Sequence, residues 1–176
     1  MILSPEQIRS DLQQLWPAAS KDFLDTLMKL YPSRLGQSSY TRRAQIFGDA
    51  IINCGSAEVA TAVSRWSPVW KMRFNAGGKI HAATKAFLYE LQSDGQGFTP
   101  NDTLADIMKD YFVSFAVSFD PNKKIATDIA KPVWPKYESG KSTILEVNAT
   151  SIGTIRDPDQ NTRCEFFRAH GDVIKS

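Results

Sequence analysis

Residues 69–81 read VWKMRFNAGGKIH, and this stretch decides what kind of fold the chain has. Apolar residues alternate with Lys71 and Arg73, so Val69–Phe74 is predicted to be a β-strand with one apolar face. A turn containing two glycines then leads to His81. A histidine on a loop beyond a strand end is well placed for chemistry in an α/β protein. The alternative is a surface histidine, or one whose hydrogen bonds are satisfied within the fold.

Outward from this strand, the sequence predicts mostly helices. Ser4 and Ser20 precede apolar residues at helical spacing and predict two helices within residues 1–31, separated at Pro17. Further predicted helices cover residues 41–53, 57–65, 102–118 and 161–169, with Gly55 as the break between the first two of these. The helix at 102–118 is predicted to carry one apolar stripe, formed by Leu104, Ile107, Met108, Tyr111, Phe112 and Phe115. Residues 143–147 predict a second strand, which we expect to neighbour the first in a parallel or mixed sheet. Two strands do not make a stable sheet alone, so the domain is either all-helical with a ribbon or part of a larger sheet protein.

The composition excludes several classes of protein. The chain has 176 residues, of which 21 are Lys or Arg and 19 are Asp or Glu, for a net charge of +2. This balance argues against a nucleic-acid-binding protein, which would carry a basic face. The first sixteen residues lack the apolar core of a signal peptide, and no apolar run is long enough to span a membrane.

Only two cysteines occur, Cys54 and Cys164, and neither they nor the two histidines have metal-ligand spacing. Two buried thiols and one long-range disulfide are both compatible with this pattern. Asn101 and Asn148 begin glycosylation sequons, which favour an extracellular protein only weakly. No phosphate-binding loop is present, because Gly140-Lys141-Ser142 lacks the first glycine of that motif and leads into a strand. The sequence therefore predicts neither a metal nor a cofactor.

Six motifs follow one another along the chain: Phe47-Gly48-Asp49 with Cys54, the strand Trp70–Phe74, Gly78-Lys79-Ile80-His81, Tyr111–Phe115 with Asp120-Pro121-Asn122, Trp134-Pro135-Lys136-Tyr137, and Cys164-Glu165-Phe166-Phe167. In this order they resemble the C-terminal part of the type B carboxylesterase/lipase family, which includes fungal lipases and the cholinesterases. Each motif is weak by itself, and the ordered set carries the resemblance.

The resemblance implies the C-terminal part of an α/β-hydrolase fold over residues 1–176, helix-rich and with a partial sheet of few strands. It assigns His81 as the general base of a Ser-His-acid triad, in which the imidazole takes the serine proton and a carboxylate holds its tautomer. It also implies that Cys54 and Cys164 form a disulfide, as in cholinesterases.

The same resemblance shows what these residues lack. Triads of this fold run Ser, acid, His along the chain, and no Gly-x-Ser-x-Gly precedes His81. We therefore expect the nucleophile, the oxyanion hole and the triad acid to lie upstream of Met1. Ala82 also stands where family members commonly have glycine.

Two functions of different classes remain open at this point. The first is a C-terminal fragment of a carboxylic-ester hydrolase that supplies the triad histidine and is inactive alone. The second is a non-catalytic binding module that retains this part of the fold, and an unrelated helical domain is a third possibility. The complete family member would be extracellular and would act on an ester. For the isolated chain we expect self-association, because an unpaired apolar sheet edge invites it.

Overall fold

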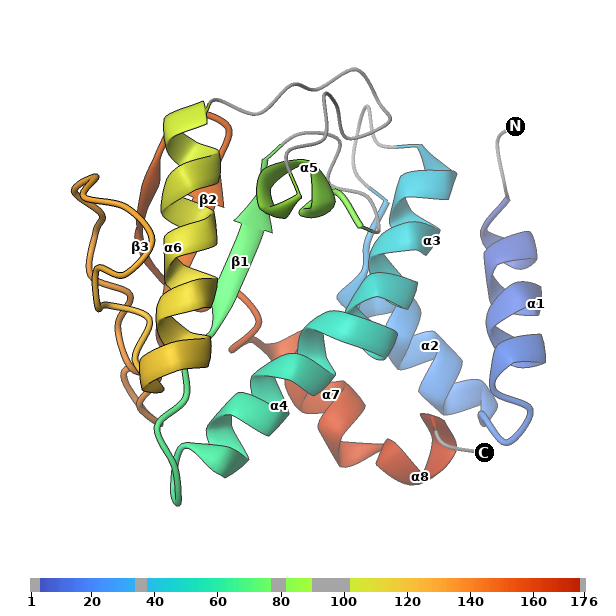
Figure 1. Cartoon of the computed structure of the whole chain (residues 1–176). Helices are drawn as coiled ribbons and strands as arrows, with labels where there is room; N and C mark the ends of the chain where they lie inside the picture. Colours follow the sequence, from blue (N-terminus) through green and yellow to red (C-terminus); the bar gives the residue numbers. More distant parts are fainter. Residues whose placement is uncertain (1–3, 34–37, 77–81, 90–101, 175–176) are drawn as a thin grey trace. The chain divides into compact units, whose positions relative to one another are not determined.

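The computed structural model describes residues 4–33, 38–76, 82–89 and 102–174, which form two compact units (Figure 1). Unit 1 contains residues 1–62 and 157–176, and unit 2 contains residues 63–156. Unit 1 is therefore built from two stretches of chain that flank unit 2 in the sequence.

Unit 1 is helical. Its elements are α1 (Pro5–Leu15), α2 (Lys21–Leu30), α3 (Ser39–Gly48), η1 (Asp49–Asn53), α4 (Cys54–Val63), α7 (Thr162–Ala169) and α8 (Gly171–Ile174). The predicted caps are confirmed: the Ser4 hydroxyl accepts from the Gln7 N–H, the Gln7 side chain accepts from the Ser4 N–H, and the Ser20 hydroxyl accepts from the Phe23 N–H. Asn161 caps α7 in the same way.

The predicted break at Gly55 is wrong. Helix α3, the π-helical turn η1 and α4 follow one another without interruption from Ser39 to Val63. An isolated glycine costs a helix only about 1 kcal/mol, and Gly55 lies at an exposed position. The cost is outweighed by the apolar residues on either side, since Ile46, Ala57 and Ala60 are buried.

The core of unit 1 gathers apolar side chains from both stretches of the chain. Its buried members are Ile8, Leu12, Trp16, Ala19, Phe23, Leu24, Leu27, Tyr31, Ile46, Cys54 and Phe167. Trp16 and Phe23 pack edge to face with ring centroids 5.9 Å apart, and Phe23 also stacks on Phe166 at 4.9 Å. Helix α7 therefore completes a core that α1 and α2 begin.

Unit 2 contains a three-stranded mixed sheet in the order β1-β2-β3. Strand β1 (Met72–Asn75) pairs in parallel with β2 (Thr143–Asn148), with Phe74 opposite Val147. This confirms the expected pairing of the two predicted strands. Strand β3 (Ile152–Arg156) pairs antiparallel with β2 and was not predicted. The helix-rich α/β class with a small sheet is thus confirmed.

The first strand begins at Met72, later than predicted, because the chain at Val69 pairs with Tyr137 and not with β2. The Val69 carbonyl accepts instead from the Tyr137 N–H at 2.7 Å, and the Lys71 carbonyl accepts from both the Leu145 N–H and the Trp134 indole. An irregular proline-containing segment thus takes the place of a regular strand partner at the start of β1.

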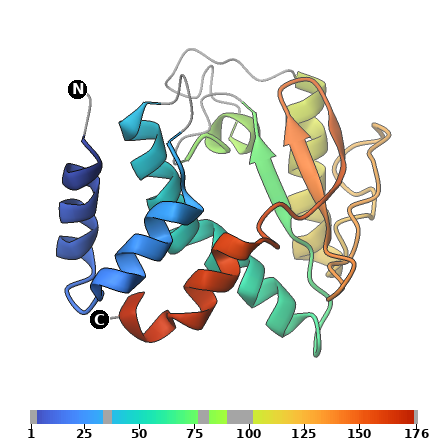
Figure 2. The same ribbon diagram turned by 180° about the vertical axis from the view of Figure 1, so that it is seen from behind.

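The described part of unit 2 also contains the helices α5 (Lys85–Leu88) and α6 (Asp102–Ser118). Helix α6 has the predicted bounds and lies along one face of the sheet, as Figures 1 and 2 show from opposite sides. The buried core between them contains Ala76, Ala86, Phe87, Leu104, Ala105, Ile107, Met108, Tyr111, Trp134, Leu145 and Val147. Phe112 and Phe115 were predicted on this inner stripe but are exposed.

Candidate functional site

The predicted general base, His81, lies outside the described residues. The description stops at Ala76, one residue beyond β1, and resumes at Ala82. Ala82 has a φ of +66°, in the left-handed region that a residue other than glycine rarely adopts. Ala83 and Ala86 are buried, so α5 is anchored in the core of unit 2. His81 therefore follows, in sequence, the carboxyl end of a parallel strand.

Polar side chains meet at this end of the sheet. The Asn75 amide donates to the Asn148 amide oxygen at 3.0 Å and, more distantly, to Glu146 at 3.4 Å. Asn148 in turn donates to Glu146 at 3.1 Å, and Arg73 lies 3.8 Å from the same carboxylate. Because β1 and β2 are parallel, their carboxyl ends share one edge, which is where open α/β sheets place their sites. This network fixes the backbone from which the histidine segment departs.

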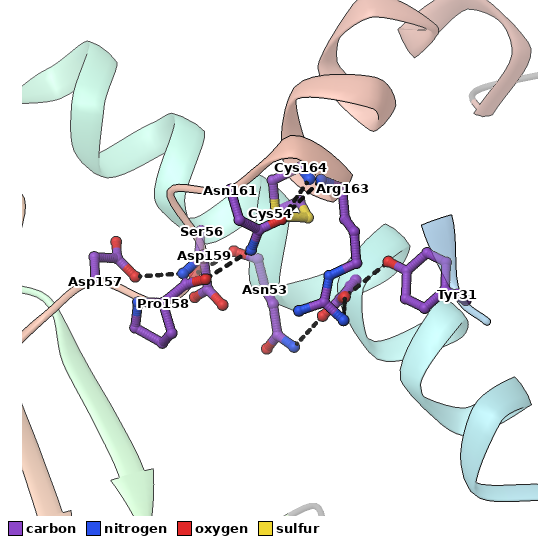
Figure 3. Close-up of a disulfide and its surroundings, with 11 residues drawn as sticks. Tyr31, Asn53, Cys54, Ser56, Asp157, Pro158, Asp159, Asn161, Arg163 and Cys164 are labelled. Atoms are coloured by element: carbon purple, nitrogen blue, oxygen red, sulfur yellow. Dashed lines mark hydrogen bonds and ion pairs between the residues drawn. A yellow bond between two sulfur atoms is a disulfide. The ribbon is translucent and has the colours of Figure 1, made fainter. Parts of the chain in front are cut away.

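The disulfide implied by the resemblance is present in unit 1. Figure 3 shows Cys54, the first residue of α4, bonded to Cys164 in α7, with Cα atoms 4.9 Å apart. Asn161 orients α7 for this bond, because its side chain accepts from the N–H groups of Arg163 and Cys164. Of the two alternatives that the spacing left open, the structure has the disulfide.

A buried carboxylate, Asp49, lies beside the disulfide. It accepts from the Tyr31 hydroxyl at 2.7 Å and from the Asn53 amide at 2.9 Å, and the Arg163 guanidinium lies 3.4 Å away. Burial and the neighbouring carboxylate raise the pKa of Tyr31, so its hydroxyl stays protonated and donates. Because Tyr31, Asn53 and Arg163 all belong to unit 1, the contacts of Asp49 cross-link that unit.

The Asp-Pro-Asn and Trp-Pro-x-Tyr motifs contact each other in unit 2. Asn122 accepts from the Trp134 N–H at 2.7 Å and donates to its carbonyl at 3.0 Å. Asp120 accepts from the Asn122 backbone at 2.9 Å, which closes the turn. The Trp134 indole donates to the Lys71 carbonyl at 3.0 Å. These two motifs therefore position the start of β1.

A buried ion pair that was not predicted joins Asp110 of α6 to Lys131. Lys131 Nζ lies 2.5 Å from Asp110, and both side chains are almost fully buried. Asp110 also accepts from the backbone N–H groups of residues 125–127. Burial opposes its charge, but the hydrogen bonds from Lys131 and the backbone outweigh burial and lower the pKa of Asp110 to about 2. A charged residue inside the apolar stripe of α6 was the signal that could have found it.

Aromatic side chains line a groove of about 330 Å³ in unit 2, formed by Pro68, Val69, Trp70, Tyr111, Phe112, Phe115, Pro121 and Trp134. The Trp70 indole nitrogen is buried and has no hydrogen-bond partner among the described residues. Phe112 and Phe115 flank the groove and are 43% and 45% exposed. The groove adjoins the start of β1, the end of the strand away from Asn75.

The two sequons differ in what the structure shows. Asn101 lies outside the described residues. Asn148 is half-buried at the end of β2, and its amide nitrogen donates to Glu146. A glycan on Asn148 would leave its amide nitrogen with a single N–H, the one that donates to Glu146.

Within the described ranges, no three His, Cys, Asp or Glu side chains are grouped so that they could hold a metal ion. One helix there, Ser39–Val63, is long and apolar enough to cross a membrane, which is weak evidence because the core helix of a soluble protein meets the same criteria. Two of its charged residues, Arg42 and Asp49, are buried against polar partners in unit 1.

Comparisons with known proteins agree with this geometry. Among solved structures, EstA of Aspergillus niger is similar with a TM-score of 0.80 and 20% sequence identity, over 98% of this chain and 37% of that one. At this identity the likeness shows the fold, and the chain spans 37% of the length of EstA. No curated protein matches the chain. A family model described as the carboxylesterase family matches residues 4–167. Since that match covers most of its length, the chain belongs to the carboxylesterase family.

Proposed function

We propose that the chain is the C-terminal portion of a serine carboxylic-ester hydrolase and that His81 is its general base. The observation that carries the proposal is the family match over residues 4–167, a range that includes His81. The position of His81 after a strand that is parallel to its neighbour supports it.

In this role the neutral imidazole of His81 takes the proton of a serine hydroxyl as that oxygen attacks the ester carbonyl. The resulting imidazolium then gives the proton to the departing alcohol oxygen, and the cycle repeats with water to release the acid. These 176 residues contain no Gly-x-Ser-x-Gly. The serine, the oxyanion hole and the triad acid therefore come from outside them, and the ester is a substrate of the complete enzyme.

The chain alone should have no serine-esterase activity, because a base without a nucleophile only assists water weakly. We would assay the purified chain on 4-nitrophenyl acetate with and without a serine-directed organophosphate. The expected rate is no more than that of a free imidazole and is insensitive to the organophosphate. His81→Gln should lower it no more than the matched control His170→Gln. Turnover that the organophosphate abolishes would overturn the proposal.

Unit 2 supports the view that more of the fold packs against it. Within the described residues, β1 has a strand neighbour on only one side, and parallel strands are normally covered on both faces and paired at their edges. Helix α6 and the residue after it expose Phe112, Phe115, Val117 and Phe119. Such a surface invites association.

Self-association of the isolated chain follows from this exposed surface. Sedimentation velocity should show species larger than a monomer, and Phe112→Ser/Phe119→Ser should shift them toward the monomer. The control Tyr40→Ser, in unit 1, should not. A stable wild-type monomer at high concentration would contradict the idea.

We further propose that the complete protein is extracellular, since a disulfide persists in oxidising compartments. Secretion would make both sequons available for glycosylation. Mass spectrometry of secreted protein should find more glycan on Asn101 than on Asn148, because Asn148 is half-buried and its amide is held by Asn75 and Glu146. Full occupancy of Asn148 would contradict this order.

A further inference from the structure

One covalent and two polar links join the two stretches of chain that form unit 1. The disulfide joins Cys54 to Cys164, and Gln160 donates to the Thr61 hydroxyl at 3.2 Å. The ion pair between Arg163 and Asp49, described above, is a third link of this kind. The first stretch of unit 1 ends at residue 62 and the second begins at residue 157. The hydrogen bond between Gln160 and Thr61 therefore joins the two stretches close to where the chain leaves unit 1 and where it returns.

Among the described residues, the apolar core of unit 1 is formed by side chains of unit 1. Every buried member of that core comes from residues 8–54 or from Phe167, and the partly buried side chains packed on it belong to the same two stretches. Trp16 and Phe167 have ring centroids 6.1 Å apart across the junction of the stretches. Unit 1 therefore has its own core, although its chain is interrupted by the whole of unit 2.

Two covalent paths connect the two stretches. One runs through unit 2, and the other is the disulfide, whose cysteines are 110 residues apart in sequence. While unit 2 is folded, its own structure fixes the path through it. Once unit 2 unfolds, that path becomes a long flexible chain, and bringing its ends together costs conformational entropy that grows with its length. The disulfide does not carry this cost.

We infer that the disulfide makes unit 1 independent of unit 2, so that unit 1 stays folded when unit 2 opens. Reduction removes this independence and joins the two units into one cooperative structure. The inference rests on the connectivity of the chain and does not depend on the proposed function.

A double-variant cycle in the full chain tests this. Leu145→Asp/Val147→Asp places two charges in the fully buried core of unit 2 and should unfold it. Loss of hydrogen-exchange protection in α6 verifies that state, and Tyr111→Asp in the same core is a second route to it. Thr154→Asp, on an exposed position of β3, adds a charge to the same sheet without unfolding it. Cys54→Ser/Cys164→Ser removes the disulfide in either background.

The readout is hydrogen-exchange protection of α2 and α7, which report on unit 1. With the disulfide closed, unfolding unit 2 should change this protection less than tenfold. Removing the disulfide as well should lower it on the order of a thousandfold, the entropic effect of a loop of this length. In the background with unit 2 folded, or with Thr154→Asp, removing the disulfide should have a much smaller effect.

Two results would overturn the inference. One is loss of α2 and α7 protection in the unit 2 variants while the disulfide is closed. The other is an equal loss of this protection on removing the disulfide, whether unit 2 is folded or unfolded. The contribution of the disulfide would then not depend on the state of unit 2.

A dithiol should reproduce the cysteine variants. The disulfide accepts two electrons and two protons and becomes two thiols, while dithiothreitol loses them and closes its own disulfide. Cys164 is the more exposed of the two cysteines and gives the reductant access. Dithiothreitol should collapse unit 1 protection in the unit 2 variants and leave it largely intact in the wild type. Retained protection in reduced unit 2 variants would contradict the inference.

Discussion

Units 1 and 2 each bury a carboxylate, but they use it differently. In unit 1, Asp49 is held by side chains that come from separate helices and loops, so its contacts cross-link elements that are already regular. In unit 2, Asp110 is held by Lys131 and by the backbone N–H groups of one irregular loop. The contacts of Asp49 thus join helices, whereas the contacts of Asp110 hold residues 125–127, a segment with no secondary structure.

The largest expected effect comes from breaking the Asp110 pair. Lys131→Met leaves a buried charge without its partner, and we expect unit 2 to lose about 3–5 kcal/mol of unfolding free energy. Arg163→Met should cost unit 1 less, because the Arg163 side chain lies 3.4 Å from Asp49 and is 28% exposed, whereas the Lys131 side chain lies 2.5 Å from Asp110 and is 3% exposed. Urea titrations followed by hydrogen exchange would report each unit separately. The exposed Lys124→Met is the control, and equal losses for Lys131→Met and Arg163→Met would remove the distinction.

Core truncations test whether the two units unfold separately. Leu27 and Leu145 are both fully buried, one in each unit. Leu27→Ala and Leu145→Ala should each lower the unfolding free energy of their own unit by about 2–5 kcal/mol. With the disulfide closed, exchange protection should fall mainly in the unit that carries the substitution. A loss spread evenly over both units would show one cooperative domain.

Acid should distinguish the units as well. The pKa of Asp110 falls from its ordinary value of 3.8 to about 2 on folding, so its charge stabilises unit 2 fully above pH 4. This contribution, about 2 kcal/mol, is lost as the pH falls through 2. Urea midpoints of α6 protection between pH 5 and pH 2 would measure it, and Asp110→Asn should remove that part of the slope. A slope unchanged in Asp110→Asn would refute the assignment.

The smallest effect tests a helix cap in unit 1. Ser20→Ala removes the hydroxyl that accepts from the Phe23 N–H at 3.1 Å, and should cost about 1 kcal/mol. The control Ser10→Ala lies at an exposed position inside α1, where alanine is the better helix former. Thermal unfolding followed by circular dichroism should separate the two variants. No difference between them would mean that the cap contributes nothing.

The parts of the fold that follow local rules could be predicted from the sequence. The bounds of α6, the caps at Ser4 and Ser20, and the pairing of the two predicted strands all depend on patterns within a few residues or on simple alternation. Strand β3 was missed because Gly153 interrupts its alternation, and glycine weakens a strand signal.

The remaining errors have causes that a local pattern does not contain. Asp110 and Lys131 are 21 positions apart, so no periodicity links them, and only the tertiary fold brings them together. Phe112 and Phe115 fit the inner stripe of α6 by spacing alone, yet they border the groove. The disulfide was implied by family resemblance, because two cysteines so far apart carry no local signal. His81 stays a prediction.

The π-helical turn η1 has a consequence for how this gene can change. Its wider turn lets the Cys54 N–H bond to the Asp49 carbonyl, five residues back, where a regular helix would use the residue four back. The segment between Asp49 and Cys54 therefore contains one residue more than an α-helical turn needs. Loss of the codon for Ile51 or Ile52 should produce an ordinary helix with Asp49 and the cysteine still on one face. Loss of a codon within α3 would instead rotate everything before it by about 100° relative to the cysteine. In this helix, the tolerated single-codon deletions should cluster in η1.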